Sequence, residues 1–348
     1  MARRGLITAI AVAAGLALLA WQVHHTGADH IVQGVRAVGW WGAAGIGVLS
    51  LLRFTARSTG WSALIPVDVP PGRALAAMIA GEAAGSLTPF SFAVSEPTKA
   101  VYLGGGMEGV GTRGALAALA AETYIFGISI GLYVMAGAAA LLYAYPVERE
   151  LRLAGIGAIG LTAVGLAVAG LMAWRKPRLV SAALARVTGR SADTGGLKPV
   201  GSISALIEHI RAFEHLAYGS TAHPTARLGI VILAATMFHI LSFLELWLTI
   251  WLITGESHLA AAFILDTFGR LTNILFKMIP LQLGVLQIGS ELVALAIGLA
   301  PGVGVTVSLI RTVRVMAWSL VGLVLLAARA RGTGEPRNRG TGGTGAGI

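Results

Sequence analysis

The sequence contains no cysteine in its 348 residues. Disulfide bonds, thiolate metal sites and cysteine nucleophiles are therefore excluded, and cysteine content says nothing about the redox compartment. Charged residues are scarce as well, because they make up 12% of the chain, about half the share found in soluble domains. So few charges cannot coat a soluble globule of this length. This excludes a soluble enzyme, a secreted toxin and a soluble DNA-binding domain.

Aspartate is rare, and no nucleotide-binding signature is present. The aspartates Asp29, Asp68, Asp193 and Asp266 are far apart, whereas Mg²⁺-diphosphate chemistry needs clustered carboxylates. A GxxxxGK[ST] phosphate-binding loop is missing, so ATP-driven transport by this chain alone is not expected. We therefore expect no cofactor, no metal site and no catalytic residue.

Apolar residues are abundant, at 55% of the chain, and they fall in long runs. This pattern predicts an all-α, polytopic membrane protein. We expect one membrane domain over 1–328 and a disordered, Arg- and Gly-rich cytoplasmic tail over 329–348. The first run is interpreted as an uncleaved helix, with a cleaved signal peptide as the alternative. Full spans are predicted over 5–23, 38–52, 114–145, 153–174, 228–254 and 303–327, with broken apolar segments over 74–103 and 259–299.

The net charge of +10 would suggest nucleic acid in a soluble protein, but here its distribution indicates topology. If the N-terminus is cytoplasmic, the external segments 24–37, 146–152 and 255–258 sum to −1. The internal segments 1–4, 53–73, 104–113, 175–227 and 329–348 sum to +12. Both termini are therefore expected in the cytoplasm, with no nucleic-acid partner. Within 175–227, helical spacing of apolar residues predicts an amphipathic helix over 203–217.

Charges inside the apolar segments are the unexpected feature of the sequence. Each would cost roughly 2.5–3.5 kcal/mol at the centre of a bilayer. They must therefore pair, lie at the interface or line a wet cavity. For any one residue, a contact between helices or an interfacial position is as good an interpretation as a place in a cavity wall. For the group, a polar cavity is the better interpretation. The set is Glu82, Glu96, Lys99, Glu122, Glu245, Asp266, Arg270, Lys277, Glu291, Arg311 and Arg314.

The two broken segments resemble each other weakly. Each has glycine followed by a charged residue, then a proline, then Ser-Glu; the positions are Gly81-Glu82, Pro89 and Ser95-Glu96, and Gly269-Arg270, Pro280 and Ser290-Glu291. In the expected topology the first segment starts and ends inside, and the second starts and ends outside. Similar elements of opposite orientation indicate an inverted repeat, which places a substrate site near the midplane. Each element is interpreted as either a re-entrant helix pair or two short spans.

At these residues the sequence resembles the flippase-like membrane family that includes the transmembrane region of lysylphosphatidylglycerol synthases and hopanoid-associated relatives. The first signature is GEAAGSLTPFSFAVSEPTKAVYL, with Gly81, Glu82, Pro89, Ser95, Glu96, Pro97 and Lys99, followed by Glu122 in the next span. The second, looser signature has Pro280, Gly284, Glu291, Gly298, Arg311, Arg314 and Trp318. The resemblance covers about residues 5–327.

The sequence departs from the family pattern in two places. Leu281-Gln282 follows Pro280 where the family often has Gly-Gly, and Thr312 replaces the second of two paired arginines. No aminoacyl-transferase domain is expected after residue 328. The resemblance therefore implies the part that translocates lipid rather than the part that modifies it.

The leading hypothesis is a lipid flippase of the bacterial inner membrane, and not an enzyme. The headgroup of a phospholipid, glycolipid or isoprenoid lipid, anionic or phosphate-bearing, would cross through the charged cavity. Two alternatives remain: an accessory or scaffold subunit working with envelope-lipid enzymes, and, ranked lower, an intramembrane lipid-modifying transferase. Candidate substrate-binding residues are Glu82, Glu96, Lys99, Glu122, Arg270, Lys277, Glu291, Arg311 and Arg314; the helix breaks are Pro89, Pro97, Pro280 and Gly284.

Overall fold

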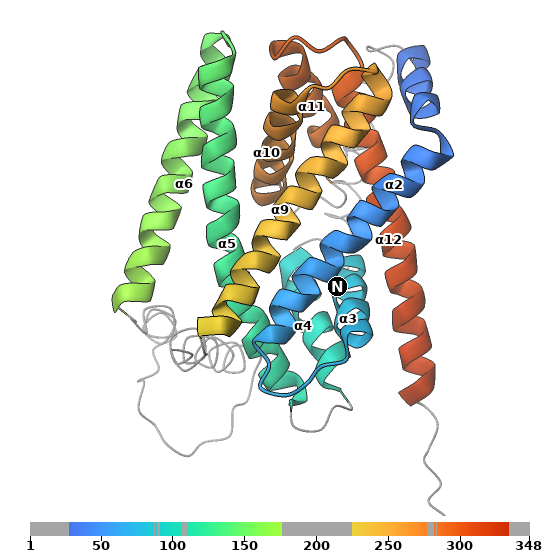
Figure 1. The fold of residues 1–348 in the computed structure, drawn as a ribbon, viewed down its shortest axis with the longest axis vertical. Coiled ribbons are helices and arrows are strands. Elements are labelled where there is room, and N and C mark those ends of the chain that lie inside the picture. The colour runs from blue at the N-terminus through green and yellow to red at the C-terminus, as the bar shows by residue number, and fades with distance from the viewer. Residues whose placement is uncertain are drawn as a thin grey trace, which may run out of the picture.

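The computed structural model describes residues 28–86, 88, 91–105, 110–175, 225–276, 282 and 284–333. These residues form nine helices and no strand, which confirms the all-α class for the described part of the chain. The helices are α2 (Ala28–Ala63), α3 (Pro71–Ser86), α4 (Ser91–Gly104), α5 (Gly111–Ala144), α6 (Arg149–Arg175), α9 (Thr225–Thr254), α10 (Leu259–Leu275), α11 (Val285–Ala296) and α12 (Val303–Thr333). Figure 1 shows them as an elongated bundle.

Five helices in the described part are long and apolar enough to cross a membrane. They correspond to five of the six predicted full spans: Arg36–Ala63, Gly111–Ala144, Arg149–Leu171, Ala226–Thr254 and Val303–Ala330. The sixth prediction, 5–23, lies outside the described residues, as does the predicted amphipathic helix over 203–217. Helix α12 continues to Thr333, past the expected end of the membrane domain at 328.

Helix α2 corrects one sequence prediction. The loop expected over 53–73 is wrong, because α2 continues to Ala63 before a short connection leads into α3. Arg53 ends the apolar run in the sequence, but in the structure it lies inside the helix and pairs with a carboxylate of α9. The helix is interrupted earlier, at Gly39, whose φ of +57° places it in the left-handed region.

The two broken segments form two pairs of short helices. Helices α3 and α4 pack against each other, and so do α10 and α11. With 16, 14, 17 and 12 residues, none reaches the roughly 20 residues that a full span needs. Figure 1 shows the α3–α4 pair in the lower half of the bundle and the α10–α11 pair in the upper half. The α2–α3 connection lies at the lower end, and the α5–α6 and α9–α10 connections lie at the upper end.

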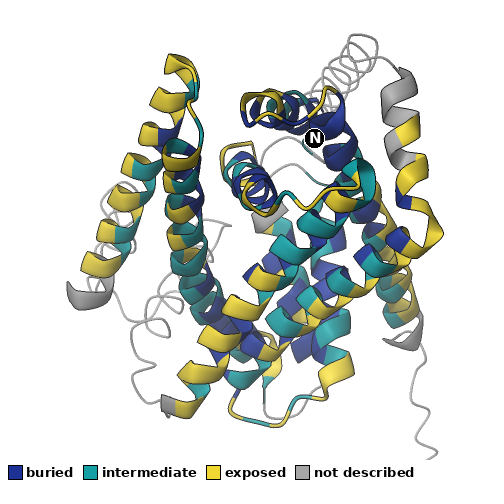
Figure 2. Ribbon diagram, turned by 45° about the horizontal axis from the view of Figure 1, so that its top comes forward, coloured by how far each residue is buried: buried dark blue, intermediate teal, exposed yellow. Residues whose placement is uncertain are grey.

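Each pair is embedded in its own apolar core. Trp61 of α2 is fully buried among residues of α3, α4 and α5, and its Nε1 donates a hydrogen bond to the Ala115 carbonyl at 3.0 Å. At the other end, Ile264 of α10 and Val293 of α11 pack with α9 and the start of α12. Figure 2 shows that α6, in contrast, exposes most of its surface.

Helix α12 contacts both pairs. Near its middle, Ser319 shares a hydrogen bond of 2.7 Å with Ser86 of α3. One turn further, Gly322 lies so close to α3 that a Cβ atom would overlap Ala83 and come within 2.7 Å of the Ile79 carbonyl. The start of α12 packs on α11, where a Cβ on Gly304 would overlap backbone atoms of Ser290. Glycine is needed at both contacts because the backbones approach closely.

Candidate functional site

A cavity of about 510 Å³ lies between the two helix pairs. Every described helix except α6 contributes to its wall. The volume falls in the range of about 300–1,000 Å³ typical of ligand pockets. Its wall is strongly charged, and the charges fall into two groups.

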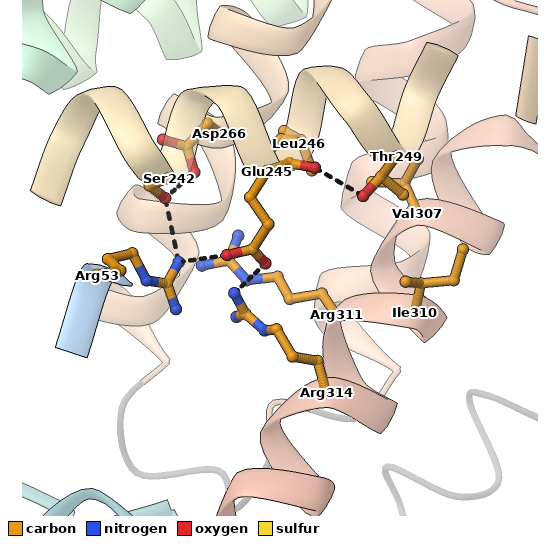
Figure 3. Close-up of a pocket in the computed structure, with 10 residues that line it drawn as sticks. All are labelled: Arg53, Ser242, Glu245, Leu246, Thr249, Asp266, Val307, Ile310, Arg311 and Arg314. Carbon is orange, nitrogen blue, oxygen red and sulfur yellow. Dashed lines mark hydrogen bonds and ion pairs between the residues drawn. The ribbon is translucent and has the colours of Figure 1, made fainter. Parts of the chain in front are cut away.

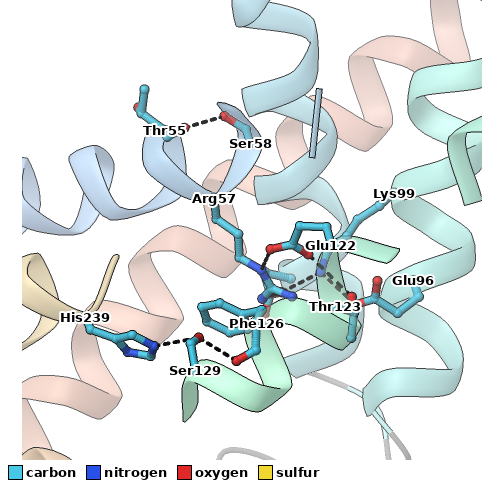
Figure 4. Close-up of polar contacts among 11 residues, drawn as sticks. Thr55, Arg57, Ser58, Glu96, Lys99, Glu122, Thr123, Phe126, Ser129 and His239 are labelled. Carbon is cyan, nitrogen blue, oxygen red and sulfur yellow. Dashed lines mark hydrogen bonds and ion pairs between the residues drawn. The ribbon is translucent and has the colours of Figure 1, made fainter. Parts of the chain in front are cut away.

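The first group, called the acidic cluster, consists of Arg57, Glu82, Glu96, Lys99 and Glu122; Figure 4 labels all of these except Glu82. Lys99 Nζ lies 2.6 Å from Glu82 Oε1 and 2.9 Å from Glu96 Oε1. Arg57 lies 3.3 Å from Glu122 and 3.4 Å from Glu82. Three carboxylates thus face two basic groups, a formal excess of one negative charge.

The second group, called the basic cluster, consists of Arg53, Glu245, Asp266, Arg270, Arg311 and Arg314; Figure 3 labels all of these except Arg270. Glu245 of α9 pairs with Arg53 at 3.3 Å and with Arg314 of α12. Arg270 donates to Asp266 Oδ2 from Nε at 3.0 Å and from Nη2 at 2.8 Å. Four guanidinium groups thus face two carboxylates, a formal excess of two positive charges.

Arg311 has no acceptor in the basic cluster. Among the described residues, no carboxylate lies within ion-pair distance of it, and Figure 3 draws no contact from its guanidinium. It nevertheless lines the cavity. An unpaired guanidinium in a protein interior is costly, so an anion from outside the chain would stabilise this arrangement.

Sequence reasoning missed Arg53 and Arg57, which it assigned to a cytoplasmic loop. Four residues apart on α2, they lie on one face of the helix, and each enters one of the two clusters. A signal was present, because Ser50, Arg53, Phe54 and Arg57 recur at helical spacing and all line the cavity. This spacing was overlooked because an arginine was expected to end the span.

The structure brings most of the predicted site residues together. Glu82, Glu96, Arg270, Arg311 and Arg314 line the cavity. Lys99 and Glu122 are buried and bind residues of the cavity wall. Lys277, Pro89 and Pro280 lie outside the described residues. Of the other predicted breaks, Pro97 lies inside α4 rather than at its end, and Gly284 precedes α11 with a φ of +82°.

Glu291 is not brought to the cavity. Its Oε1 accepts the backbone N–H of Gly302 at 2.6 Å, and its Oε2 accepts that of Val305 at 3.0 Å. These N–H groups belong to the first turn of α12 or precede it, where the helix itself supplies no acceptors. Glu291 therefore fixes α11 to the start of α12, a structural contact that its place in a signature motif did not reveal.

In both helix pairs, a glycine beside a charged residue has the same structural role. A Cβ on Gly81, before Glu82, would overlap the aliphatic chain of Lys99. A Cβ on Gly269, before Arg270, would overlap the guanidinium of Arg311. In each pair the missing side chain leaves room for a long basic side chain of a neighbouring helix. The weak similarity seen in the sequence thus has a physical counterpart.

Replacing Gly81 with alanine is expected to lower the free energy of unfolding by about 1–3 kcal/mol, the usual cost of overpacking. The new methyl group would displace Lys99 and lie 2.9 Å from the Ser95 carbonyl. Thermal unfolding in detergent measures the effect. The matched control is Gly72→Ala on the same helix, where no atom lies within 4 Å of a Cβ; it should be neutral or slightly stabilising. Equal effects of the two substitutions would contradict the prediction.

A GxSxG sequence, the spacing of a hydrolase nucleophile, spans Gly127 to Gly131 but lies in the middle of α5. Nucleophile elbows need a strand-to-helix turn, and α5 supplies none. Ser129 donates to the Phe126 carbonyl at 2.7 Å and lies 2.9 Å from His239 Nε2 (Figure 4). The His239 ring stacks against Phe126 and Tyr133. This geometry is typical of helix packing.

Comparison with known protein families gives one match. The lysylphosphatidylglycerol synthase TM region matches residues 6–325, which is nearly the whole chain. Comparisons with curated proteins and with solved structures gave no match. The match includes both helix pairs, the cavity between them and both charged clusters. The chain is therefore a polytopic membrane protein that belongs to the family of the lysylphosphatidylglycerol synthase TM region.

Proposed function

We propose that the protein moves a lipid headgroup across the bacterial inner membrane, without changing the lipid chemically. The observation that carries this is the charged cavity between the two short helix pairs. Exposed apolar side chains on α5, α6, α9 and α12 suit contact with acyl chains, so only the headgroup needs to enter the cavity. Its path would have polar walls, whereas direct passage through hydrocarbon has none.

The α3–α4 and α10–α11 pairs would act as re-entrant elements of an inverted repeat. Each helix of the two pairs is too short to cross the membrane alone. Each pair begins and ends at one side of the bundle (Figure 1). The shared glycine arrangement at Gly81 and Gly269 supports a relation between them. In such folds the substrate site lies where the broken elements meet.

A phosphate group of the substrate would bind at the basic cluster. Arg311 has no acceptor there, and its planar guanidinium suits bidentate phosphate binding. Arg270 shares the cavity wall with it, although its ion pair with Asp266 fixes its position. Enzymes of envelope-lipid synthesis are the proposed partners, since they supply substrate on one side of the membrane.

Proteoliposomes test the function directly. Wild-type protein should accelerate the exchange of acyl-labelled phospholipid between leaflets, measured as the fraction of label that an impermeant quencher reaches with time. Protein-free liposomes and liposomes with an unrelated helical membrane protein are the controls. Absence of acceleration with every phosphate-bearing lipid tried would count against transport and favour an accessory role.

The proposed orientation, with both termini in the cytoplasm, can be tested with single cysteines, because the chain has none of its own. Glu148→Cys, between α5 and α6, should react with an impermeant thiol reagent added to intact spheroplasts. Asp68→Cys, between α2 and α3, should react only after the membrane is opened. Both positions are exposed and lie at opposite ends of the bundle. The reverse labelling pattern would contradict cytoplasmic termini.

A further inference from the structure

We infer that the acidic cluster is a proton-binding site, and that Glu96 takes up a proton when a phosphate-bearing headgroup enters the cavity. The inference rests on the proposed function, which specifies neither an energy source nor a direction of movement. It makes the protein a cotransporter that carries a proton and a lipid headgroup in the same direction. A pH gradient across the membrane then drives lipid movement toward the alkaline side.

Glu96 has one carboxylate oxygen without a partner. Its Oε1 accepts a hydrogen bond from Lys99 Nζ at 2.9 Å (Figure 4), whereas its Oε2 is buried and has no hydrogen-bond partner among the residues that the structure describes. Buried polar atoms are rarely left in this state, because the cost of desolvation is not offset. A proton can add to Oε2 without breaking an existing hydrogen bond, and it removes the charge of a side chain in a residue that is only 8% exposed.

Three other carboxylates of the two clusters have a partner at each oxygen. In Glu122, Oε1 accepts a hydrogen bond from an arginine and Oε2 accepts one from a threonine hydroxyl. In Asp266, the two donors are a serine hydroxyl and an arginine. Glu245 forms an ion pair through each of its oxygens. Protonation of these groups would disrupt an existing contact, which favours Glu96 as the proton acceptor.

Glu96 also lies where a proton can reach it from solvent. It lines the cavity, whose volume of about 510 Å³ has room for water. His239 is a buried residue of the kind that titrates near neutral pH, but it is not among the residues that line the cavity, and its ring stacks against Phe126 and Tyr133. A proton therefore reaches Glu96 through the same space that the headgroup occupies.

The charged groups around Glu96 come from four helices. Lys99 of α4 binds both Glu96 and Glu82 of α3. Arg57 of α2 and Glu122 of α5 interact with Glu96 electrostatically. Three carboxylates thus share two basic groups, so the cluster has one negative charge in excess. One proton on Glu96 makes the cluster neutral, while Lys99 stays bound to Glu82.

The charge of the basic cluster makes proton uptake depend on the headgroup. The acidic cluster has a formal charge of −1 and the basic cluster of +2, so that together these described residues carry +1. A proton alone would raise this charge to +2, which is costly in a protein interior. A proton that arrives with a singly charged phosphate leaves it at +1. The lipid anion and the proton together then move no net charge across the membrane.

The two clusters are close enough to influence each other. Arg53 and Arg57, one from each cluster, are four residues apart on α2, which is about 6 Å along the helix axis. Opposite charges at such a separation attract each other more strongly inside a protein than in water, because the dielectric constant is lower. A phosphate at the basic cluster therefore strengthens proton binding at the acidic cluster. By linkage, the proton strengthens phosphate binding by the same factor.

The test uses proteoliposomes that contain a trace of acyl-labelled phosphatidylglycerol and have a pH gradient across the membrane. The label should accumulate in the leaflet on the alkaline side, and the ratio between leaflets should approach about tenfold per pH unit, the limit for one proton per lipid. A membrane potential without a pH gradient should leave the ratio at one, because no net charge moves. An impermeant quencher measures the ratio, and protein-free liposomes are the control.

Variants of Glu96 test its role. Glu96→Gln should lose the accumulation, because a carboxamide cannot release a proton. Glu96→Asp, which retains a carboxylate, should keep it, and Glu150→Gln, at an exposed position of α6, should behave like the wild type. Exchange of label without a gradient and the Tm in detergent are measured on the same preparations, which distinguishes loss of coupling from loss of movement or of folding. Accumulation by Glu96→Gln would overturn the assignment of the proton to Glu96.

A proton-uptake measurement separates this inference from the proposed function. When soluble glycerophosphoglycerol is added to the wild type in weakly buffered detergent solution, the protein should take up as much as one proton per molecule bound, and Glu96→Gln should take up none. Lipid movement without accumulation across a pH gradient would overturn proton cotransport and leave transport intact. Proton uptake without movement of any lipid would overturn transport and support the proton site. Neither uptake nor accumulation in the wild type would overturn the proton site.

Discussion

Replacing Glu245 with alanine is expected to lower the free energy of unfolding by about 3–5 kcal/mol, the usual cost of breaking a buried ion pair from one side. Glu245 binds Arg53 of α2 and Arg314 of α12 at once. Without it, four arginines share the single carboxylate of Asp266. Three helices would lose their common polar contact, and the remaining cations would repel one another. Unfolding in mixed detergent micelles measures the effect.

The matched control is Glu256→Ala in the α9–α10 connection. Its side chain is 76% exposed, and it lies 3.3 Å from His258. An exposed pair of this kind contributes little, so the control should unfold like the wild type. If Glu245→Ala were as stable as the control, the basic cluster would not hold these helices together.

Replacing Arg311 with alanine is expected to reduce lipid movement at least about tenfold, while the fold remains as stable as the wild type or becomes more stable. Loss of one charge-assisted phosphate contact corresponds to this factor. No protein partner is lost, because Arg311 has no ion pair among the described residues. Removing its charge also relieves repulsion with Arg53 and Arg314 across the small space that they share. Transport in proteoliposomes and unfolding in detergent are measured on the same preparation.

Two controls make this result specific. Arg152→Ala, on the exposed surface of α6, should change neither measurement. Arg314→Ala should lower stability, because its partner Glu245 would lose one of its two cations. If Arg311→Ala instead lowered stability and left transport unchanged, Arg311 would be a structural residue. An accessory role predicts unchanged transport-linked phenotypes for every one of these variants.

The length of the apolar runs sufficed to predict the five spans and both broken segments. These features depend on the bilayer, which sorts residues by polarity regardless of their partners. The sequence also singled out the intramembrane charges as a group. Glu245 and Asp266 were among them, although neither was named as a site residue, and both now hold the basic cluster together.

The pairing of those charges could not be predicted, because it depends on how helices distant in the sequence pack. Arg53 was assigned to a loop because an unpaired arginine is costly inside a helix bundle. Its partner on α9, which offsets this cost, is known only from the structure. Glu291 was placed in the site because its motif matches that of Glu96, but a turn after α11 directs it to backbone N–H groups instead. Identical dipeptides thus have different uses when the next element arrives from a different direction.

Helix α12 has a mechanical consequence. Its start is held to α11 by Glu291, and its middle is held to α3 by the Ser86–Ser319 hydrogen bond and the close contact at Gly322. A continuous helix attached at both places couples the positions of the two helix pairs. If the α3–α4 pair is displaced away from the cavity, α12 is displaced with it, and α12 in turn displaces the α10–α11 pair. Motion of one helix pair is therefore expected to be transmitted to the other through α12.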